Sequence, residues 1–313
     1  MRIGLDIMGS DHGPLIPVRA AVLAARELPA GVRLVLIGNE QAIRDGLQAE
    51  AADPAHFDII PSKDDIGMGD HASKALASKP ESSIALGFRL LKAGQLDAFC
   101  STGNTGAMLA GSVMVMKPMP GVQRPCITSI LPKADGGFGL MVDVGSNADC
   151  KPETLFQFGL LGSLYAQYVY KIAAPKVALL SIGEEEKKGN ALTLAAHTLM
   201  KGTDRFNFVG NVEGRDLFGN KADVVVCDGF TGNVVLKALE GFHGLIKARM
   251  TVADPFLDRF DYQNYGGTPV LGVDGTVMIG HGISNDGTVK NMLLLTRKVV
   301  DSKLHERIHE AFR

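Results

Sequence analysis

The chain has 313 residues, of which 46% are hydrophobic and 21% charged, a balance typical of a globular protein with a well-filled core. Its formal net charge is -2 and it contains no Trp, so it offers neither a basic field nor stacking platforms for nucleic acid. The first residues form no apolar leader, and no apolar run reaches the ~20 residues of a membrane span. We therefore expect a cytoplasmic protein without a nucleic-acid partner.

Apolar runs typical of strands alternate with helical patterns along the chain. The expected strands cover residues 2–8, 33–37, 97–100, 127–131, 138–142, 177–181, 206–209, 224–227, 270–273 and 276–279. The expected helices cover residues 17–27, 41–50, 82–93, 105–116, 152–170 and the end of the chain from residue 286. This alternation predicts an α/β fold, and hairpin signals at 133–137 and Asp274-Gly275 make its mostly parallel sheet a mixed one. No linker is present, so any second domain is expected to be interleaved with the first.

Five of the runs end in a short loop of Gly, Asn, Asp, Ser or Thr before a helical pattern. They cover residues 2–12, 97–107, 139–151, 177–192 and 223–237. In α/β proteins, the ends of parallel strands and the starts of the following helices direct free N–H groups at one crevice, which binds anions and above all phosphate. The loops therefore predict one anion site built by several segments.

The first two of these loops are rich in donors and ionisable groups. In the loop after the first strand, the density of ionisable groups favours a functional site. The alternative is a tight turn in which Asp11 caps the next helix. Its candidates are Asp6, Gly9, Asp11 and His12. In the second loop, N-capping by Ser101 or Thr102 uses the same donors as anion binding, so both readings can hold. Its candidates are Ser101, Thr102, Gly103, Asn104 and Thr105.

Two later loops combine acids with amides. The first places carboxylates and a cation before a helix that starts at Pro152, although charged loops are often solvated surface. Its candidates are Asp143, Asn147 and Lys151. The second is opened by two glycines, and Asn233 is expected to start a helix there. Its candidates are Asp228, Thr231, Gly232 and Asn233.

The remaining candidates carry most of the cations. The run 183–190 indicates either a solvated charge cluster or part of the site, with Lys188 and Asn190 as its candidates. The next loop contributes Asn211, Glu213 and Arg215, and the guanidinium of Arg215 suits a phosphate. A lone His more often has a structural role than a functional one. His281 lies between two glycines, and this flexible backbone on both sides argues against a purely structural role.

Common nucleotide and nucleophile motifs are absent from the sequence: there is no GxxxxGK[ST], no GxGxxG after a strand and no GxSxG. The four cysteines lack zinc-ligand spacing, and Cys100 and Cys227 are expected to be buried thiols. What remains is a set of amide donors, carboxylates and a few cations without a marked nucleophile. Such a set suits positioning and electrostatic catalysis on an oxyanion or phosphate.

Taken together and in order, these loops resemble the PlsX family, the phosphate acyltransferases of bacterial phospholipid synthesis. The resemblance runs from residue 1 to about residue 300. Its motifs are Asp6-Ile-Met-Gly-Ser-Asp-His-Gly13, Ser101-Thr-Gly-Asn-Thr-Gly106, Asp143-Val-Gly145, Asn147-Ala-Asp-Cys-Lys-Pro152, Ile182-Gly-Glu-Glu-Glu186, Lys188-Gly-Asn190, Gly210-Asn-Val-Glu-Gly-Arg-Asp216, Asp228-Gly-Phe-Thr-Gly-Asn-Val-Val-Leu-Lys237, Tyr265-Gly-Gly-Thr-Pro269 and Gly280-His-Gly282. Any one motif is weak, but the ordered set is highly specific.

The resemblance implies a fold like that of isocitrate and isopropylmalate dehydrogenases, related to phosphotransacetylases. It implies one α/β unit over residues 1–313, with two interleaved subdomains and a central cleft. The implied reaction moves a fatty acyl group from acyl-[acyl carrier protein] to inorganic phosphate, and the acyl-phosphate then feeds a glycerol-3-phosphate acyltransferase. A homodimer is also implied. No cofactor is expected, and a metal requirement stays open.

Phosphate is itself a nucleophile, so this reaction needs no enzyme serine or cysteine. The protein has to hold phosphate beside the thioester carbonyl and stabilise the tetrahedral oxyanion. Our hypothesis is that Lys188 and Asn233 orient phosphate and stabilise charge. His281 is expected to manage a proton or to contact phosphate. The other candidates are taken as substrate- and phosphate-binding residues.

A helical segment is expected at about 233–262, where many members of the family carry a longer basic and apolar stretch linked to the membrane surface. Its apolar residues at helical spacing favour a dimer or core helix, with peripheral membrane contact as the alternative. They are Val235, Leu239, Phe242 and Ile246, with Lys237, Lys247 and Arg249 nearby.

Three other functions compete with this one. A short-chain phosphotransacetylase would use an acyl-CoA, and a β-decarboxylating dehydrogenase on the same fold would need a metal and NAD. A non-catalytic scaffold for lipid-synthesis enzymes is the third. Several basic residues are candidates for the docking surface of an acidic carrier protein, and the sequence does not choose among them. They are Arg89, Lys92, Lys117 and Arg124.

Overall fold

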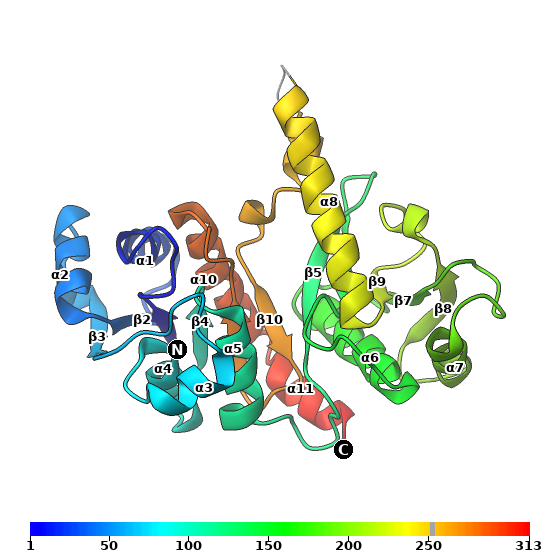
Figure 1. Cartoon of the computed structure of the whole chain (residues 1–313), viewed down its shortest axis with the longest axis horizontal. Coiled ribbons are helices and arrows are strands. Elements are labelled where there is room, and N and C mark those ends of the chain that lie inside the picture. Colours follow the sequence, from blue (N-terminus) through cyan, green and yellow to red (C-terminus); the bar gives the residue numbers. More distant parts are fainter. Residues whose placement is uncertain (251–253) are drawn as a thin grey trace. The chain divides into compact units, whose positions relative to one another are not determined.

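The computed structural model of the chain describes residues 1–250 and 254–313, apart from the side chain of Tyr262. Two compact units make up this part of the chain, and each is built from two separate segments (Figure 1). Unit 1 comprises Met1–Met119 and Tyr262–Asp301, and unit 2 comprises Pro120–Asp261 and Ser302–Arg313. The chain therefore passes from unit 1 into unit 2, returns to unit 1, and ends in unit 2.

Unit 1 contains strands in the order β3-β2-β1-β4-β11-β10, all parallel except β10, which pairs antiparallel with β11. Its strands are β1 (Arg2–Asp6), β2 (Arg33–Gly38), β3 (Phe57–Pro61), β4 (Ala98–Ser101), β10 (Thr268–Leu271) and β11 (Thr276–Ile279). Its helices are α1 (Leu15–Glu27), α2 (Glu40–Ala49), α3 (Ala72–Ser78), α4 (Ser83–Lys92), α5 (Thr105–Gly111) and α10 (Asp286–Asp301), with short helical turns η1 (Pro54–His56), η2 (Ser112–Met116) and η4 (Tyr262–Asn264). Because the parallel strands run the same way, the loops after β1, β4 and β11 leave the same edge of the sheet.

Strand β4 shows why helices cover both faces of this sheet. Successive residues of a strand point to opposite faces. The ring of Phe99 packs edge-on against Phe88 of α4, with 5.4 Å between ring centroids. The next residue, Cys100, places its Sγ 3.2 Å from the hydroxyl of Thr296 on α10. Helices α4 and α10 therefore lie on opposite faces of β4, and the strand is fully buried between them.

Unit 2 contains strands in the order β5-β6-β9-β7-β8, all parallel except β5, which forms an antiparallel hairpin with β6. Its strands are β5 (Cys126–Pro132), β6 (Phe138–Val142), β7 (Lys176–Leu180), β8 (Asn207–Val212) and β9 (Val224–Val226). Its helices are α6 (Pro152–Tyr168), α7 (Ala191–Met200), α8 (Gly229–Arg249), α9 (Pro255–Asp258) and α11 (Leu304–Ala311), with the turn η3 (Gly214–Asp216). The loops after β6, β9, β7 and β8 therefore share one edge of this sheet.

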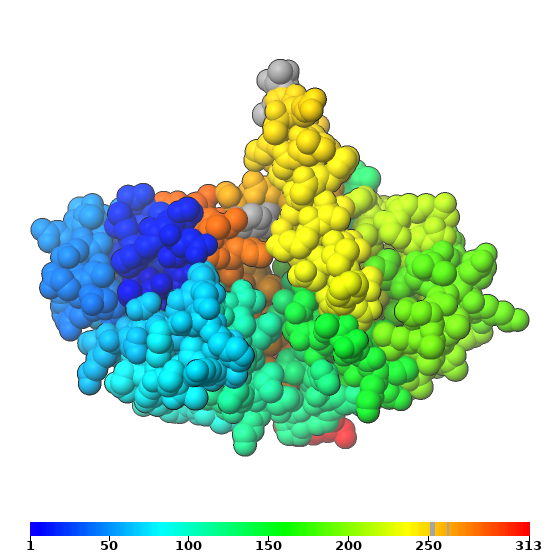
Figure 2. Space-filling view, in the orientation of Figure 1, coloured from blue at the N-terminus to red at the C-terminus, as the bar shows by residue number. Residues whose placement is uncertain are grey.

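Helix α8 is long and largely exposed. At 21 residues it extends well beyond the strands, and its atoms stand clear of the body of its unit (Figure 2). Only Gly229 and Gly232, in its first turn, are buried. The side chains further along are exposed or half-buried, so α8 is not a core helix.

Most of the expected architecture is confirmed. The sheets are mixed and mostly parallel, and both hairpins form. Some boundaries were wrong. Helix α5 ends at Gly111 and continues as a π-helical turn, the last helical stretch breaks between α10 and α11, and α8 begins at Gly229 rather than at Asn233. The segment expected at 233–262 includes residues 251–253, which lie outside the described residues.

Within the described part of the chain, no helix combines the length and the apolar character needed to cross a membrane.

Candidate functional site

In unit 1, the loop after β1 is joined to the loop after β4 by a buried hydrogen-bond chain. Asp6, at the end of β1, is 1% exposed, and its Oδ2 accepts a 2.6 Å hydrogen bond from the hydroxyl of Ser101. The Ser101 oxygen in turn accepts the backbone N–H of Gly103 at 2.9 Å. Asp6 therefore holds Ser101 in the orientation that fixes Gly103.

Burial raises the pKa of Asp6 above its ordinary value, although the hydrogen bond from Ser101 opposes this shift. A carboxylate removed from water loses its hydration, and the donors on it replace only part of that loss.

Glycines allow three loops to approach one another here. A Cβ at Gly9 would lie 2.5 Å from the N of Gly103 and 2.7 Å from Oδ2 of Asp6, so any side chain would push the first two loops apart. The loop after β11 joins them through two backbone hydrogen bonds of 2.9 Å. They run from the N–H of Asp11 to the carbonyl of Gly282 and from the N–H of Gly280 to the carbonyl of Ser101.

Two hydroxyls in this loop cluster are buried without a hydrogen-bond partner among the described residues, namely Thr102 Oγ1 and Ser284 Oγ, each in a residue that is 1% exposed. A buried hydroxyl without a partner is costly, which makes both of them candidate donors to a ligand. By contrast, His12, Thr105 and His281 are exposed. Ser284 was not among the sequence candidates, although it lies three residues after His281 in the same loop.

Asn104, expected to bind substrate, already uses both ends of its amide within the protein. Its Oδ1 accepts the N–H of Ala107 and so caps α5. Its Nδ2 donates to the carbonyls of Gly67, Met68 and Asp70 at 3.0–3.1 Å. The alternative in which Ser101, Thr102 or Asp11 caps a helix is wrong, because Asn104 occupies the N-cap position of α5 and Pro14 that of α1.

In unit 2, Asp143 organises the loop after β6. The residue is fully buried. Its carboxylate accepts the backbone N–H groups of Ile127 (3.1 Å), Ser146 (3.3 Å) and Asn147 (2.8 Å), the Ser146 hydroxyl (2.7 Å) and the Asn147 amide (3.0 Å). Asn147 also donates to the carbonyl of Pro125 at 2.8 Å. Both side chains hold the loop in place, whereas Lys151, just before α6, is exposed.

The start of α8 packs tightly against this loop. A Cβ at Gly232 would collide with the carbonyl oxygen of Asp143, so glycine is required there. Asp228 caps the helix, because its carboxylate accepts the N–H and the hydroxyl of Thr231, both at 2.8 Å. Asn233 therefore lies inside the first turns of α8. Its Nδ2 makes a long hydrogen bond, 3.3 Å, to the carbonyl of Val144.

The loop between β7 and α7 presents Lys188 to solvent. Neighbouring acids in this loop have basic partners: Glu184 pairs with Lys221 at 2.6 Å and Glu186 with Lys201 at 2.7 Å. Within the described residues the Lys188 ammonium has no such acidic partner. Asn190 caps α7 by accepting the N–H of Thr193 at 2.9 Å.

The loop after β8 supports the Lys188 loop. Asn211 is 7% exposed and donates through Nδ2 to the carbonyl of Glu185 at 3.1 Å, while its Oδ1 is buried without a partner among the described residues. Glu213 pairs with the exposed Arg215 at 3.0 Å. The side chain of Arg215 remains largely in solvent despite this ion pair.

The cysteines are free thiols, and Cys100 and Cys227 are buried as expected. Burial raises the pKa of Cys100 to about 12, so this side chain stays a thiol at neutral pH. Within residues 1–250 and 254–313, no three His, Cys, Asp or Glu side chains gather as a metal-ligand set.

Comparison with solved structures defines the fold. A phosphotransacetylase from Streptococcus pyogenes superposes with a TM-score of 0.70 at 14% identity, covering 96% of this chain and 94% of that one. A putative 4-hydroxythreonine-4-phosphate dehydrogenase from Salmonella typhimurium gives a TM-score of 0.56 at 13% identity, covering 95% of this chain and 99% of that one. The fold is thus one that phosphotransacetylases share with a group of dehydrogenases, as the sequence predicted.

The family follows from sequence comparison. Residues 1–307 match the family model described as "Fatty acid synthesis protein". A phosphate acyltransferase from Desulforamulus reducens is 40% identical over 328 aligned positions, which cover 99% of this chain and 97% of that protein. The chain belongs to this family, the PlsX family of phosphate acyltransferases, and it is an acyltransferase.

The raised pKa of Asp6 predicts a pH dependence of stability. Since the folded pKa lies above the ordinary value of 3.8, Asp6 contributes stability that is present below that value and is lost as pH rises through the raised one. We expect wild type to lose stability relative to Asp6→Asn as pH rises, by at most about 1.4 kcal/mol per pH unit. Urea denaturation of both proteins across this range measures the difference. A difference that is constant with pH, or that moves the other way, would contradict the prediction.

Proposed function

We propose that the protein transfers a fatty acyl group from acyl-[acyl carrier protein] to inorganic phosphate, and that the acyl-phosphate serves phospholipid synthesis through a glycerol-3-phosphate acyltransferase. The observation that carries the proposal is the match to phosphate acyltransferases over nearly the whole chain. The carrier-protein donor rests on the resemblance of the ordered loops. Inorganic phosphate and the carrier protein are therefore the proposed partners.

The proposed step is direct attack. A phosphate oxygen adds to the thioester carbonyl, the tetrahedral oxyanion collapses, and the carrier's thiolate leaves and takes up a proton. Such a step needs donors placed where negative charge develops rather than an enzyme nucleophile. Lys188 supports this role because its ammonium has no acidic partner among the described residues, while Glu184 and Glu186 in the same loop pair with other lysines.

Asn233 and His281 are assigned from their exposure and their places in the loops. Asn233 is exposed near the start of α8, and only its long bond to Val144 engages the amide nitrogen within the described residues. We assign it to phosphate orientation beside Lys188. His281 is exposed on the loop that contains the unpartnered hydroxyl of Ser284, and we assign it to phosphate contact or proton transfer.

A short-chain phosphotransacetylase reaction with an acyl-CoA is the second candidate, because the solved neighbours include phosphotransacetylases. Acyl-[acyl carrier protein] and acyl-CoA with the same acyl group separate the two functions. We expect phosphate-dependent acyl-phosphate formation with at least tenfold higher kcat/KM for the carrier-protein donor. A preference for acyl-CoA would transfer the proposal to the second candidate, and no acyl-phosphate from either donor would refute both.

Lys188 and Asn233 provide the test of the site. Removal of one donor to a developing oxyanion costs roughly 100- to 1,000-fold in kcat. We expect losses of this order in Lys188→Ala and Asn233→Ala, measured as acyl-phosphate formed per enzyme. Lys187→Ala is the matched control, since it removes a neighbouring exposed lysine and should retain turnover. Circular dichroism checks folding, and near-normal turnover in both test variants would refute the assignments.

We further propose that α8 forms the homodimer contact. The exposed side of this helix displays large apolar side chains, including Phe230 (66% exposed), Phe242 (61%) and Leu245 (57%). The opposite side faces the returning chain, where His243 stacks on Phe260 and Lys247 pairs with Asp261 at 3.2 Å. Exposed apolar surface of this kind marks an interaction site.

Sedimentation analysis tests this assembly. Wild type is expected to be a dimer and Phe242→Glu a monomer, because a charge in the contact would be buried without a partner. Leu199→Glu, an equivalent change at an exposed leucine of α7, should remain dimeric. A monomeric wild type that pellets with acidic-lipid vesicles would instead support peripheral membrane contact.

A further inference from the structure

Two large apolar side chains lie exposed beside the polar loop cluster of unit 1. Met68 is 45% exposed and Ile283 is 57% exposed. Ile283 follows His281 by two residues, and Met68 belongs to the loop that Asn104 holds. Polar loops at strand ends do not need such side chains for folding. Their place beside a site that handles an acyl group therefore calls for a functional explanation.

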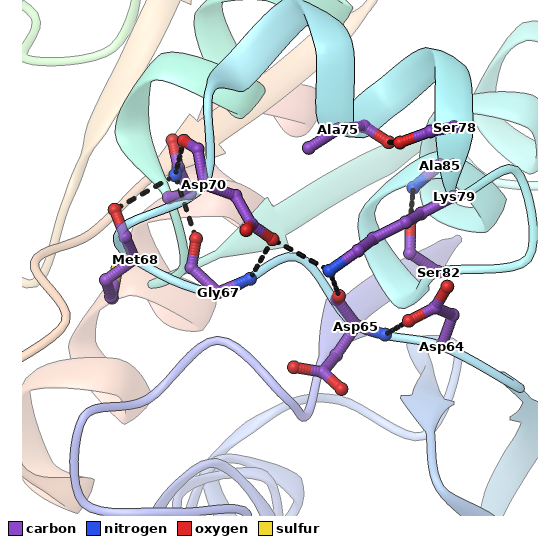
Figure 3. A network of polar contacts seen from close by, with 11 residues as sticks. Asp64, Asp65, Gly67, Met68, Asp70, Ala75, Ser78, Lys79, Ser82 and Ala85 are labelled. Carbon is purple, nitrogen blue, oxygen red and sulfur yellow. Dashed lines mark hydrogen bonds and ion pairs between the residues drawn. The ribbon is translucent and has the colours of Figure 1, made fainter.

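The loop that carries Met68 is fixed at several points (Figure 3). The amide of Asn104 donates to its carbonyls from one side. From the other side, Lys79 donates to Asp70 Oδ2 and to the carbonyl of Asp65, both at 2.8 Å, and Asp70 Oδ2 also accepts the N–H of Gly67 at 3.0 Å. The position of Met68 is thus determined by the network rather than left to solvent.

The network directs Met68 at the loop after β11. A Cβ added to Gly282 would collide with the terminal methyl of Met68 and would lie 2.6 Å from Oδ2 of Asp11. The methyl therefore rests on the backbone between His281 and Ile283. Only glycine at position 282 leaves room for this contact, which brings an apolar surface directly against the loop assigned to the chemistry.

We propose that Met68 and Ile283 form an apolar subsite for the first part of the acyl chain, next to the thioester carbonyl. Asn104 is then a positioning residue, which acts through the loop that carries Met68. An alkyl chain beside charged phosphate needs apolar surface to leave water, and methionine adapts its shape to such a chain. This inference rests on the proposed acyl transfer and assigns the part of the site that selects the acyl group.

Chain-length selectivity tests the subsite. With a series of acyl donors of increasing length, Met68→Ala should lower the ratio of kcat/KM for a long donor to that for a short one by about tenfold, since each lost contact with an alkyl group reduces discrimination. Met68→Leu should restore most of the ratio. Met114→Ala is the matched control, because Met114 is 58% exposed on η2 of the same unit, and it should leave the ratio unchanged.

Asn104→Asp tests the positioning role. Aspartate keeps an oxygen for the N–H of Ala107 but has no donor for the three carbonyls, so the cap remains and the loop is released. We expect the same loss of selectivity as in Met68→Ala, with KM for phosphate within twofold of wild type. A large rise in KM for phosphate would instead make Asn104 a phosphate ligand and overturn this part of the inference.

The failure of the subsite can be told apart from the failure of the function. Suppose that wild type forms acyl-phosphate, and that Met68→Ala either keeps the wild-type dependence of kcat/KM on chain length or loses kcat/KM equally for all donors. The subsite is then refuted and acyl transfer stands. If wild type forms no acyl-phosphate from any donor, the proposed function fails, and the subsite falls with it. Thermal unfolding of each variant excludes a folding defect as the cause.

Discussion

A buried N–H, carbonyl or carboxylate must find a hydrogen-bond partner, and this constraint shapes every polar loop of the protein. The loops lie where parallel strands end and helices begin, so each exposes unsatisfied backbone groups. Side chains within the loops supply the partners: Asn104, Asn190 and Asp228 cap α5, α7 and α8. Asp143 gathers the donors of the loop after β6, and Asp6 does the same for Ser101.

This constraint divides the polar residues into two groups. One group holds the loops and has little bonding capacity left for a ligand, as with Asp143, whose carboxylate is surrounded by donors. The other group retains capacity. Among the described residues, Lys188 has no acidic partner, and the buried hydroxyl of Thr102 has no hydrogen-bond partner. Within each unit, residues of the second group are the candidate donors to a negatively charged ligand, on loops that the first group holds in place.

The sequence predicted the elements that depend on local pattern. Strand alternation and hairpin turns follow from neighbouring residues, so β5–β6 and β10–β11 were found. Helix starts were less accurate: the Asp228-Gly-Phe-Thr231 pattern contains a capping signal, yet Asn233 was taken as the start of α8. The π-helical turn at Ser112–Met116 and the break after Asp301 have no comparable local signature, because they depend on how the helices pack.

By itself, the sequence determined the α/β class, the order of the polar loops and, through that order, the phosphate acyltransferase family, because these depend on patterns along the chain. Only the tertiary structure decided how each loop uses its side chains. Asp6 meets Ser101 across 95 positions of sequence, and Asn104 meets Met68 across 36. Hydrogen bonding acts between atoms a few ångströms apart, whatever their separation along the chain, so a linear pattern names the polar residues but does not reveal their partners.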